Sequence, residues 1–451
     1  MTAAGRHAIV VGAGIAGLAV ARALADRFER VTVIERDAAL SPRPHVPHQS
    51  HTHILGARGY RSLCRQFPGL EGDLAAAGAP RFDFGECPFH AGSWAPRIST
   101  GLVSRSCTRA LLERLLRARL VTVPNVELLA GHRTTGFVLV GDRVIAVELA
   151  GGRAIEADLV VDAAGMGSKT SDWLAGHGFP VPGKTEIDLD GAAVSQLFRP
   201  RPGVGDDWIV LFVRRGNGNF RHGAISRVED GLWRVSVWGV AGLRPPRKLP
   251  ELLAFARALG TPVFAELLEG ATPVSQPNVY GNSWSKWVHY ERLQRFPDGL
   301  VVVGDATFHP NYEHGQGMTF CAMTADLIAR HLDHHALAAR TGWSLRFQQA
   351  LGAMNAPWWD WNLAVETVVP GVASPAASRT TQLRHRYFRK LRQAAACDPK
   401  LWKAVLEVNQ AVRLPSALMH PAFALRVMRH HARSLLPQRQ GSRALVGAFE
   451  D

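Results

Sequence analysis

The chain has 451 residues, a formal charge of +14, 47% apolar residues and 20% charged residues. This composition is typical of a globular protein and excludes a fibrous or disordered chain. No apolar run reaches the ~18 residues of a membrane span, and no signal-peptide cleavage site precedes the first strand, so we expect a cytoplasmic protein whose scattered cysteines are reduced. Basic residues do not alternate with aromatic residues along the chain, so the sequence predicts no groove for nucleic acid. The net positive charge is interpreted as a basic surface rather than as a site for an acidic partner.

The first predicted elements are a strand at residues 7–11 and a helix at residues 16–24. The turn between them carries three glycines, Gly12, Gly14 and Gly17. In a dinucleotide-binding turn the first glycine permits the tight turn, the second lets the backbone approach a pyrophosphate, and the third lets the helix pack on the strand. The helix N-terminus then offers free N–H groups to the phosphates.

A second predicted strand, residues 31–34, ends at Glu35 and Arg36. An acidic residue at the carboxyl end of this strand is placed to accept hydrogen bonds from an adenosine ribose. The amino-terminal segment therefore predicts a dinucleotide site, and by itself it leaves NAD and FAD open.

The next segment is rich in histidine, with side chains at His45, His48, His51 and His53. Such a set invites comparison with a metal site. Pro44 and Pro47 interrupt any helix or regular strand, so the spacing does not bring the imidazoles onto one ion. We predict no metal site here.

Residues 186–285 change to alternating or β-rich runs separated by Gly, Pro and Asp-Gly turns, which predicts an antiparallel sheet. Six aromatic residues of this region are interpreted mostly as sheet core, with a role in lining a pocket as the alternative. They are Phe198, Trp208, Phe212, Phe220, Trp233 and Trp238.

A second cofactor segment is predicted far along the chain. A buried strand at residues 300–303 leads into Gly304 and Asp305, and a second turn precedes a helix with Gly315, Gln316, Gly317 and Met318. FAD is longer than NAD and needs a second anchor. The Asp305 carboxylate suits the ribityl hydroxyls, and the amides of Gly317 and Met318 suit the flavin ring. This segment favours FAD.

The remaining region, residues 341–451, has helical periodicity, aromatic residues and separating prolines. We expect amphipathic helices that pack over the sheet and close a substrate cavity, with Trp358, Trp359 and Trp361 near its mouth. Contact of a basic carboxyl-terminal helix with a membrane surface is the less favoured alternative.

The predicted fold class is therefore α/β. It has a Rossmann-like FAD-binding domain in two segments, residues 1–185 and 286–340, an antiparallel β substrate domain at residues 186–285, and a helical region at residues 341–451.

These motifs together resemble the FAD-dependent aromatic hydroxylase superfamily, and most closely its branch of bacterial natural-product tailoring hydroxylases and epoxidases. The resemblance covers roughly residues 7–340 and also includes residues 43–53 and a middle motif at residues 157–174. It implies that FAD is bound by Gly12, Gly14, Ala16, Gly17, Glu35, Arg36, His51, Arg109, Gly304, Asp305, Gly315, Gln316, Gly317 and Met318.

Two departures from the family pattern bear on the reaction. Ala164 and Gly165 stand where self-reducing hydroxylases carry Asp-Gly, so the electrons come from NAD(P)H either directly or through a separate flavin reductase. The proline that usually precedes the last turn is replaced by Asn311, Tyr312, Glu313 and His314. We predict Tyr312 and His314 as catalytic residues; the alternative is that Glu313 and His314 face solvent or cap the next helix.

The resemblance implies an FAD-dependent monooxygenase that transfers one oxygen atom from O2, through a flavin hydroperoxide, to a hydrophobic natural product by epoxidation or hydroxylation. The substrate is a free small molecule or is bound to a carrier protein. An FAD-dependent reductase of isoprenoid type and a non-catalytic flavin-binding protein remain alternatives. A flavin halogenase is disfavoured, because that chemistry uses a lysine soon after the dinucleotide motif and the first lysine here is Lys169.

Overall fold

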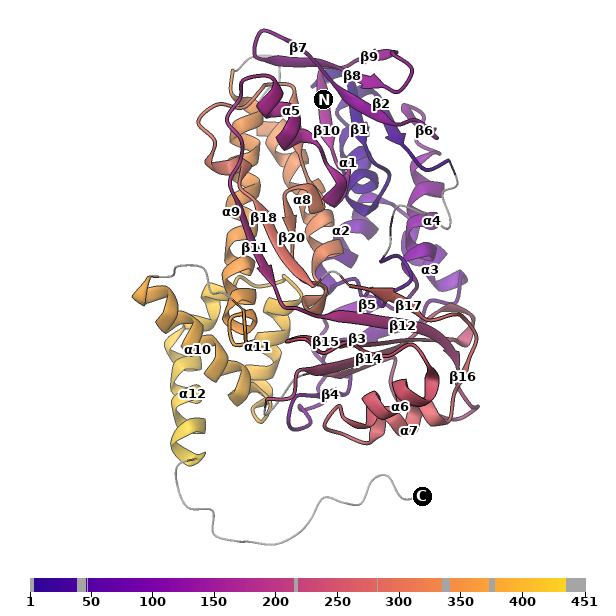
Figure 1. Cartoon of the computed structure of the whole chain (residues 1–451), viewed down its shortest axis with the longest axis vertical. Helices are drawn as coiled ribbons and strands as arrows, with labels where there is room; N and C mark the ends of the chain where they lie inside the picture. The colour runs from indigo at the N-terminus through magenta and orange to yellow at the C-terminus, as the bar shows by residue number, and fades with distance from the viewer. Residues whose placement is uncertain are drawn as a thin grey trace, which may run out of the picture.

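A parallel sheet forms the centre of the amino-terminal part of the computed structural model, which describes residues 4–38, 46, 48–214, 218–281, 283–334, 341–372 and 378–434 (Figure 1). The strand order is β19-β10-β1-β2-β6. The strands are β1 (Gly5–Val11), β2 (Phe28–Glu35), β6 (Val126–Ala130), β10 (Leu159–Asp162) and β19 (Leu300–Val302). The apolar runs of β1 and β10 are those of parallel strands covered on both faces.

Helices pack in one hydrophobic core with this sheet. They are α1 (Ile15–Ala25), α2 (Ala57–Gln66), α3 (Leu70–Ala76), α4 (Arg109–Leu120) and α8 (Gly317–His334). The sequence of α1 is apolar around its whole circumference, and nearly all of its residues are buried, because it lies against the sheet and also packs on α4 and α8.

The order of the parallel strands brings two distant turns together. β10 pairs with β1 on one side and with β19 on the other, both in parallel register. Because the carboxyl ends of parallel strands meet at one edge of a sheet, the turn after β1 and the turn after β19 lie at the same edge. A Cβ atom added at Gly304 would lie 2.8 Å from the Cβ atom of Ala16, so the two turns touch.

A seven-stranded sheet forms a second layer, in the order β16-β12-β15-β14-β13-β4 with β17 paired to β12. Its strands are β4 (Phe89–His90), β12 (Ala192–Arg199), β13 (Val210–Val213), β14 (Arg221–Arg227), β15 (Trp233–Gly239), β16 (Thr272–Pro273) and β17 (Asn278–Tyr280). It is antiparallel, as predicted, except where β4 from the first segment of the chain pairs in parallel with β13.

The two faces of this sheet have different environments. α6 (Leu249–Arg257) and α7 (Val263–Glu269) cover one face, where Phe198, Trp208 and Trp233 form a core with them (Figure 1). Phe212, Phe220 and Trp238 instead line a cavity described below. Half of the six aromatic residues interpreted mostly as core are therefore part of a cavity wall.

Smaller elements connect the two layers. A three-stranded antiparallel sheet of β11 (Lys184–Asp188), β18 (Trp284–Val288) and β20 (Phe308–His309) crosses the predicted domain limits at 186 and 285. The other short elements are β3 (Arg81–Asp83), β5 (Val103–Arg105), β7 (Thr134–Val140), β8 (Arg143–Leu149), β9 (Ala154–Glu156) and α5 (Thr170–Gly176).

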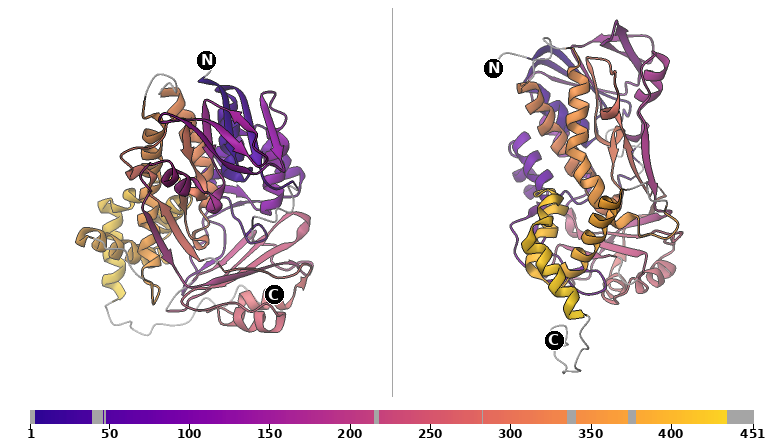
Figure 2. Two further views of the ribbon diagram at one scale, coloured as in Figure 1. Left: turned by 45° about the horizontal axis from the view of Figure 1, so that its top comes forward. Right: turned by 90° about the vertical axis from the view of Figure 1, so that its left-hand side faces the viewer.

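The last described region is helical, with α9 (Trp343–Glu366), α10 (Arg379–Ala395), α11 (Pro399–Asn409) and α12 (Pro421–Ser434). Figure 2 shows α9 as a long helix that runs from the parallel-sheet part to the other carboxyl-terminal helices. Among the described helices, none has an apolar stretch long enough to cross a membrane. Residues 435–451, part of the segment considered for membrane contact, lie outside the described residues.

The expectation that three tryptophans of α9 lie at a cavity mouth is wrong. Trp358 packs on Phe320 of α8, Trp359 packs on Trp287 of β18, and Trp361 packs on Phe388 of α10. All three are buried because α9 is enclosed by neighbours on several sides. The α/β fold class with a parallel Rossmann-like core, an antiparallel sheet and carboxyl-terminal helices is confirmed.

Candidate functional site

A cavity of about 1020 Å³ lies where the parallel sheet, the second sheet and the carboxyl-terminal helices meet. Its size is at the upper end of what ligand sites in proteins show. The predicted cofactor residues in its wall are Gly14, Ala16, His51, Arg109, Asp305, Gly315, Gln316, Gly317 and Met318, and the two predicted catalytic residues, Tyr312 and His314, line it as well. Residues from both sequence segments of the Rossmann-like part therefore line the same cavity.

The glycine turn has the geometry that a phosphate site requires. Gly12 has a φ angle of 103°, and a Cβ there would lie 2.6 Å from the Ala163 carbonyl oxygen. A Cβ at Gly17 would lie 1.8 Å from the Gly12 carbonyl oxygen, so no side chain fits. Gly14 precedes α1 and has no side chain with which to cap it. The first N–H groups of α1 therefore stay available to an anion in the cavity.

Glu35 and Arg36 are placed differently from the other predicted cofactor residues. Glu35 is buried, and its carboxylate accepts hydrogen bonds from the backbone N–H groups of Ala13, at 2.8 Å, and Asp37, at 3.0 Å. These bonds hold the loop after β1 against the end of β2. Arg36 is exposed. The ribose contact of Glu35 stays a prediction.

Arg109 lies at the start of α4 and contacts two histidines of the predicted histidine-rich segment. Its Nη1 atom is 2.8 Å from Nε2 of His48 and 3.5 Å from Nε2 of His53. Because a guanidinium only donates, His48 Nε2 is the acceptor and the ring proton is on Nδ1. Burial and the neighbouring Arg109 lower the pKa of His48 to about 3, so this imidazole is neutral at pH 7.

Three imidazole nitrogens in the cavity wall are buried and have no hydrogen-bond partner in the described part of the chain: His48 Nδ1, His51 Nε2 and His309 Nε2. His51 is held from its other side, where Nδ1 is 2.6 Å from the Ser195 hydroxyl of β12. Burial lowers the pKa of His51 to about 4. Buried polar atoms are normally paired, so these nitrogens fit a polar ligand such as FAD.

The histidine arrangement differs from that of a metal site. His48 and His53 face the Arg109 cation, which repels a metal ion. In the described ranges, which omit His45, no group of three or more possible metal-binding side chains was found.

Asp305 follows β19 and carries the charge expected of a ribityl anchor. Burial raises the pKa of its carboxyl group, but His309, His48 and Arg109 outweigh burial and lower that pKa to about 2. His309 Nδ1 is 3.4 Å from the carboxylate. Burial lowers the pKa of His309, and the Asp305 charge more than compensates and raises it.

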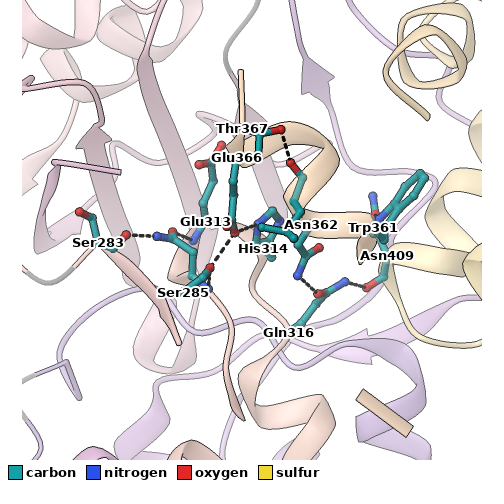
Figure 3. A network of polar contacts seen from close by, with 12 residues as sticks. Ser283, Ser285, Glu313, His314, Gln316, Trp361, Asn362, Glu366, Thr367 and Asn409 are labelled. Carbon is teal, nitrogen blue, oxygen red and sulfur yellow. Dashed lines mark hydrogen bonds and ion pairs between the residues drawn. The ribbon is translucent and has the colours of Figure 1, made fainter. Parts of the chain in front are cut away.

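Figure 3 shows how the loop before α8 is held by buried polar contacts. Nε2 of His314 is 2.7 Å from Oε1 of Glu366, the last residue of α9, and the Ser285 hydroxyl donates to the same oxygen at 2.7 Å. Ser285 also accepts a hydrogen bond from the Asn311 backbone N–H at 3.0 Å. Asn311 accepts from the Glu313 N–H and donates to the Ser283 carbonyl.

Gln316, which follows this loop, forms hydrogen bonds with residues of α9 and α11. It accepts a hydrogen bond from Asn362 of α9 at 3.0 Å and donates to the Asn409 carbonyl of α11 at 3.2 Å (Figure 3). The carboxyl-terminal helices thus hold this loop. The alternative that Glu313 and His314 face solvent is wrong, since Glu313 is 8% exposed and the His314 side chain 11%.

Tyr312 presents a neutral hydroxyl to the cavity. Its ring meets Trp238 and Tyr280 edge-on, with ring centroids 6.4 and 6.0 Å apart. Burial raises the pKa of Tyr312, so it stays protonated. The hydroxyl oxygen is buried and has no partner among the described residues. An unpartnered buried hydroxyl in the cavity wall fits a hydrogen bond to a ligand.

Sequence reasoning missed Glu366, Ser285 and Asn362. Each is far along the chain from the loop that it holds, and none belongs to a recognisable motif. The only available signal was the polar loop itself, because four hydrogen-bonding side chains placed in a closed site need partners.

Comparisons with known proteins agree with this geometry. Residues 10–68 match the model of the NAD(P)-binding Rossmann-like domain. The chain is 30% identical over 461 aligned positions to Protein Rv3254 of Mycobacterium tuberculosis, covering 98% of this chain and 97% of that one.

Solved structures show the same fold. The flavin-dependent brominase Bmp2 matches 95% of this chain and 100% of its own, with 13% identity and a TM-score of 0.68. PqsL of Pseudomonas aeruginosa, named as a probable FAD-dependent monooxygenase, matches 81% of this chain and 97% of its own, with 17% identity and a TM-score of 0.60. The chain therefore belongs to the family of Protein Rv3254 and has the fold of the flavin-dependent monooxygenases.

Proposed function

We propose that this protein is an FAD-dependent monooxygenase that transfers one oxygen atom from O2 to a hydrophobic natural product, by epoxidation or hydroxylation. The observation that carries the proposal is a single cavity whose wall contains both the Rossmann glycine turn and Asp305, together with Phe212, Phe220 and Trp238 of the second sheet. Such a cavity has room and suitable groups for a dinucleotide and an aromatic or otherwise apolar compound.

The residues fit FAD from its pyrophosphate to its ring. The N-terminus of α1 would hold the pyrophosphate, Asp305 the ribityl hydroxyls, and the amides of Gly317 and Met318 at the start of α8 the ring. His48 Nδ1 and His51 Nε2 would form hydrogen bonds with other polar atoms of the cofactor. When bound, FAD supplies the electrons with which O2 is activated.

The chain itself would orient the substrate, exclude water and handle protons. Tyr312 offers its hydroxyl proton as a hydrogen-bond donor. His314 is fixed through Nε2 by Glu366, and its Nδ1 atom makes no hydrogen bond to a described residue. His314 lines the cavity and would exchange a proton with the substrate, while the buried Glu366 carboxylate holds the ring in place.

The first test is flavin binding. We expect the purified protein to carry FAD, seen by its visible absorbance, or to recover it when FAD is added. Asp305→Asn should weaken FAD binding about tenfold or more, because a charge-assisted hydrogen bond contributes roughly 1.5–3 kcal/mol. Asp207→Asn, in an exposed ion pair with Arg97, is the matched control. A protein that binds no FAD would remove the basis of the proposal.

The oxygenase reaction has its own test. A ligand that co-purifies is identified by mass spectrometry and returned to the reduced FAD-loaded protein under ¹⁸O2, where we expect one labelled oxygen atom in the product. Turnover without O2 consumption would favour a reductase of isoprenoid type. Flavin reoxidation at one rate with every candidate substrate would favour a non-catalytic flavin-binding protein.

The source of electrons is part of the proposal. Because Ala164 replaces the family's aspartate, we propose that NAD(P)H acts through a separate flavin reductase. Anaerobic mixing with NADH or NADPH should then bleach the bound flavin slowly, and a flavin reductase should speed the bleaching. Rapid bleaching without a reductase would show direct reduction.

Halogenation is a second candidate, supported by the similarity to the brominase Bmp2. Against it, no lysine is among the described residues that line the cavity, and Lys169 is exposed beside Asp172. Adding bromide to the oxygenase reaction decides the question. A brominated product would favour the halogenase, and an unchanged oxygenated product would exclude it.

A further inference from the structure

One side of the cavity wall is basic. Arg389 and Arg392 of α10, three residues apart and hence on one helix face, both line the cavity, and His430 and His431 of α12 join them. These helices lie away from α1, whose N-terminus is the proposed pyrophosphate site (Figure 1). The basic side is therefore distinct from the pyrophosphate end of the predicted cofactor site.

The basic side chains of α10 differ in whether they contact an acidic residue. Arg384 forms an ion pair with the Asp360 carboxylate, which His385 also contacts, at distances of 2.7 to 2.9 Å. Arg389 instead donates one hydrogen bond, of 3.3 Å, to the Ala364 carbonyl and forms no ion pair with a described acidic residue. A guanidinium has five N–H groups, so Arg389 keeps both its charge and donors for a ligand.

Arg392 is oriented by its surroundings. Its guanidinium lies over the Trp361 ring, 3.7 Å from the ring centroid, and donates to the Trp361 carbonyl at 3.3 Å. Stacking and this hydrogen bond fix the plane of the guanidinium, which is the arrangement that recognises planar anions and phosphates. Both arginines are half-buried, so a bound anion is partly shielded from solvent.

The same cavity has apolar walls beside the arginines. Trp402, Val405 and Leu406 of α11 line it, and Phe89 of β4 packs against Trp402 with ring centroids 5.0 Å apart. A ligand that satisfies both surfaces has an apolar body and one anionic group.

We propose that the substrate of this site is such an amphipathic acid and that Arg389 and Arg392 bind its anionic group. The inference rests on the monooxygenase function proposed above. It names a carboxylate or phosphate as the recognised chemistry, whether the group is part of a free acid or of a phosphate-bearing arm attached to a carrier.

Two fluorescent probes with the same ring system test the proposal in the FAD-loaded protein. They are 1-anilinonaphthalene-8-sulfonate, which carries an anion, and N-phenyl-1-naphthylamine, which does not. We expect the anionic probe to bind at least tenfold more tightly and its affinity to fall with added salt. Competition by decanoate and by decyl phosphate, with 1-decanol as the neutral control, then distinguishes a carboxylate from a phosphate.

Matched variants separate recognition from a structural role. Arg389→Gln and Arg392→Gln should each weaken the anionic probe about tenfold and leave the neutral probe and the flavin absorbance unchanged. Arg386→Gln, exposed on the same helix, should change neither. Three results would each overturn the inference. They are equal affinities of the protein for the two probes, no binding of the anionic probe, and equal losses of affinity for both probes in the arginine variants. If the protein retains no FAD, the proposed function fails instead.

Discussion

Nε2 of His314 and Oε1 of Glu366 lie 2.7 Å apart, although 52 residues separate them in the chain. Glu366 is fully buried at the end of α9, and His314 lines the cavity. This contact joins the carboxyl-terminal helices to the loop that precedes α8. The helical region is therefore part of the candidate active site and more than a cover for it.

Removal of the Glu366 carboxylate should destabilise the protein. Glu366→Ala leaves the His314 ring and the Ser285 hydroxyl without their partner, and breaking such a buried pair costs about 3 kcal/mol of unfolding free energy. Glu366→Gln, which keeps an acceptor oxygen, should lose less. Urea unfolding measures both. Glu269→Ala, in an exposed pair with Arg257, is the control and should change stability by about 0.5 kcal/mol or less. Equal losses at Glu366 and Glu269 would contradict the prediction.

Replacement of His314 should affect turnover more than cofactor binding. His314→Gln keeps a hydrogen-bond donor toward Glu366 and removes the exchangeable ring proton, so we expect kcat to fall about 100-fold at unchanged flavin content. Substrate-dependent O2 consumption and flavin absorbance measure the two quantities. A parallel loss of FAD would instead mean that His314 holds the cofactor site together.

The close packing of the first turn predicts a sharp response to one methyl group. Gly17→Ala places a Cβ 1.8 Å from the Gly12 carbonyl oxygen, which forces α1 away from the turn. We expect a loss of about 2 kcal/mol or more in unfolding free energy and a loss of FAD binding. Gly176→Ala, where the added Cβ would meet no side chain or distant backbone atom within 4 Å, should lose neither stability nor FAD binding. Thermal unfolding with and without FAD checks the pair, and a stable, FAD-binding Gly17→Ala protein would count against the assigned geometry.

The histidine cluster predicts acid sensitivity. His48 and His51 have pKa values lowered from 6.5 to about 3 and about 4, so below pH 6.5 the unfolded chain takes up protons that the folded protein does not. Stability is then complete above pH 6.5 and falls as the pH drops toward 4, by about 1.4 kcal/mol per pH unit for each imidazole.

Asp305 acts in the same direction at lower pH, since its pKa is lowered from 3.8 to about 2 and its contribution is lost as the pH falls through that range. His309, whose pKa is raised, acts in the opposite direction. Urea unfolding at several pH values should show a flatter curve for His48→Gln and for His51→Gln than for the unchanged protein. An equally steep curve in both variants would assign the acid sensitivity to other groups.

The sequence by itself determined the elements whose signals are local. The apolar run before Gly12, the glycine spacing and the helical pattern after it encode β1 and α1, because strand burial, positive φ and helix packing each restrict residue type within a short segment. The turn after β19, at Gly304 and Asp305, has the same kind of local signal. Parallel pairing then leaves one edge of the sheet at which both turns meet.

Only the tertiary structure decided which distant side chains complete the site. Glu366, Arg389 and Arg392 reach the cavity wall or its loop because α9 and α10 pack where they do, and Ser285 reaches that loop from β18. The packing of α9 also buries the tryptophans that were expected at the mouth. A residue's local sequence specifies its backbone preference and polarity. Its partners across the fold depend on the sum of many weak packing contacts, which no single segment encodes.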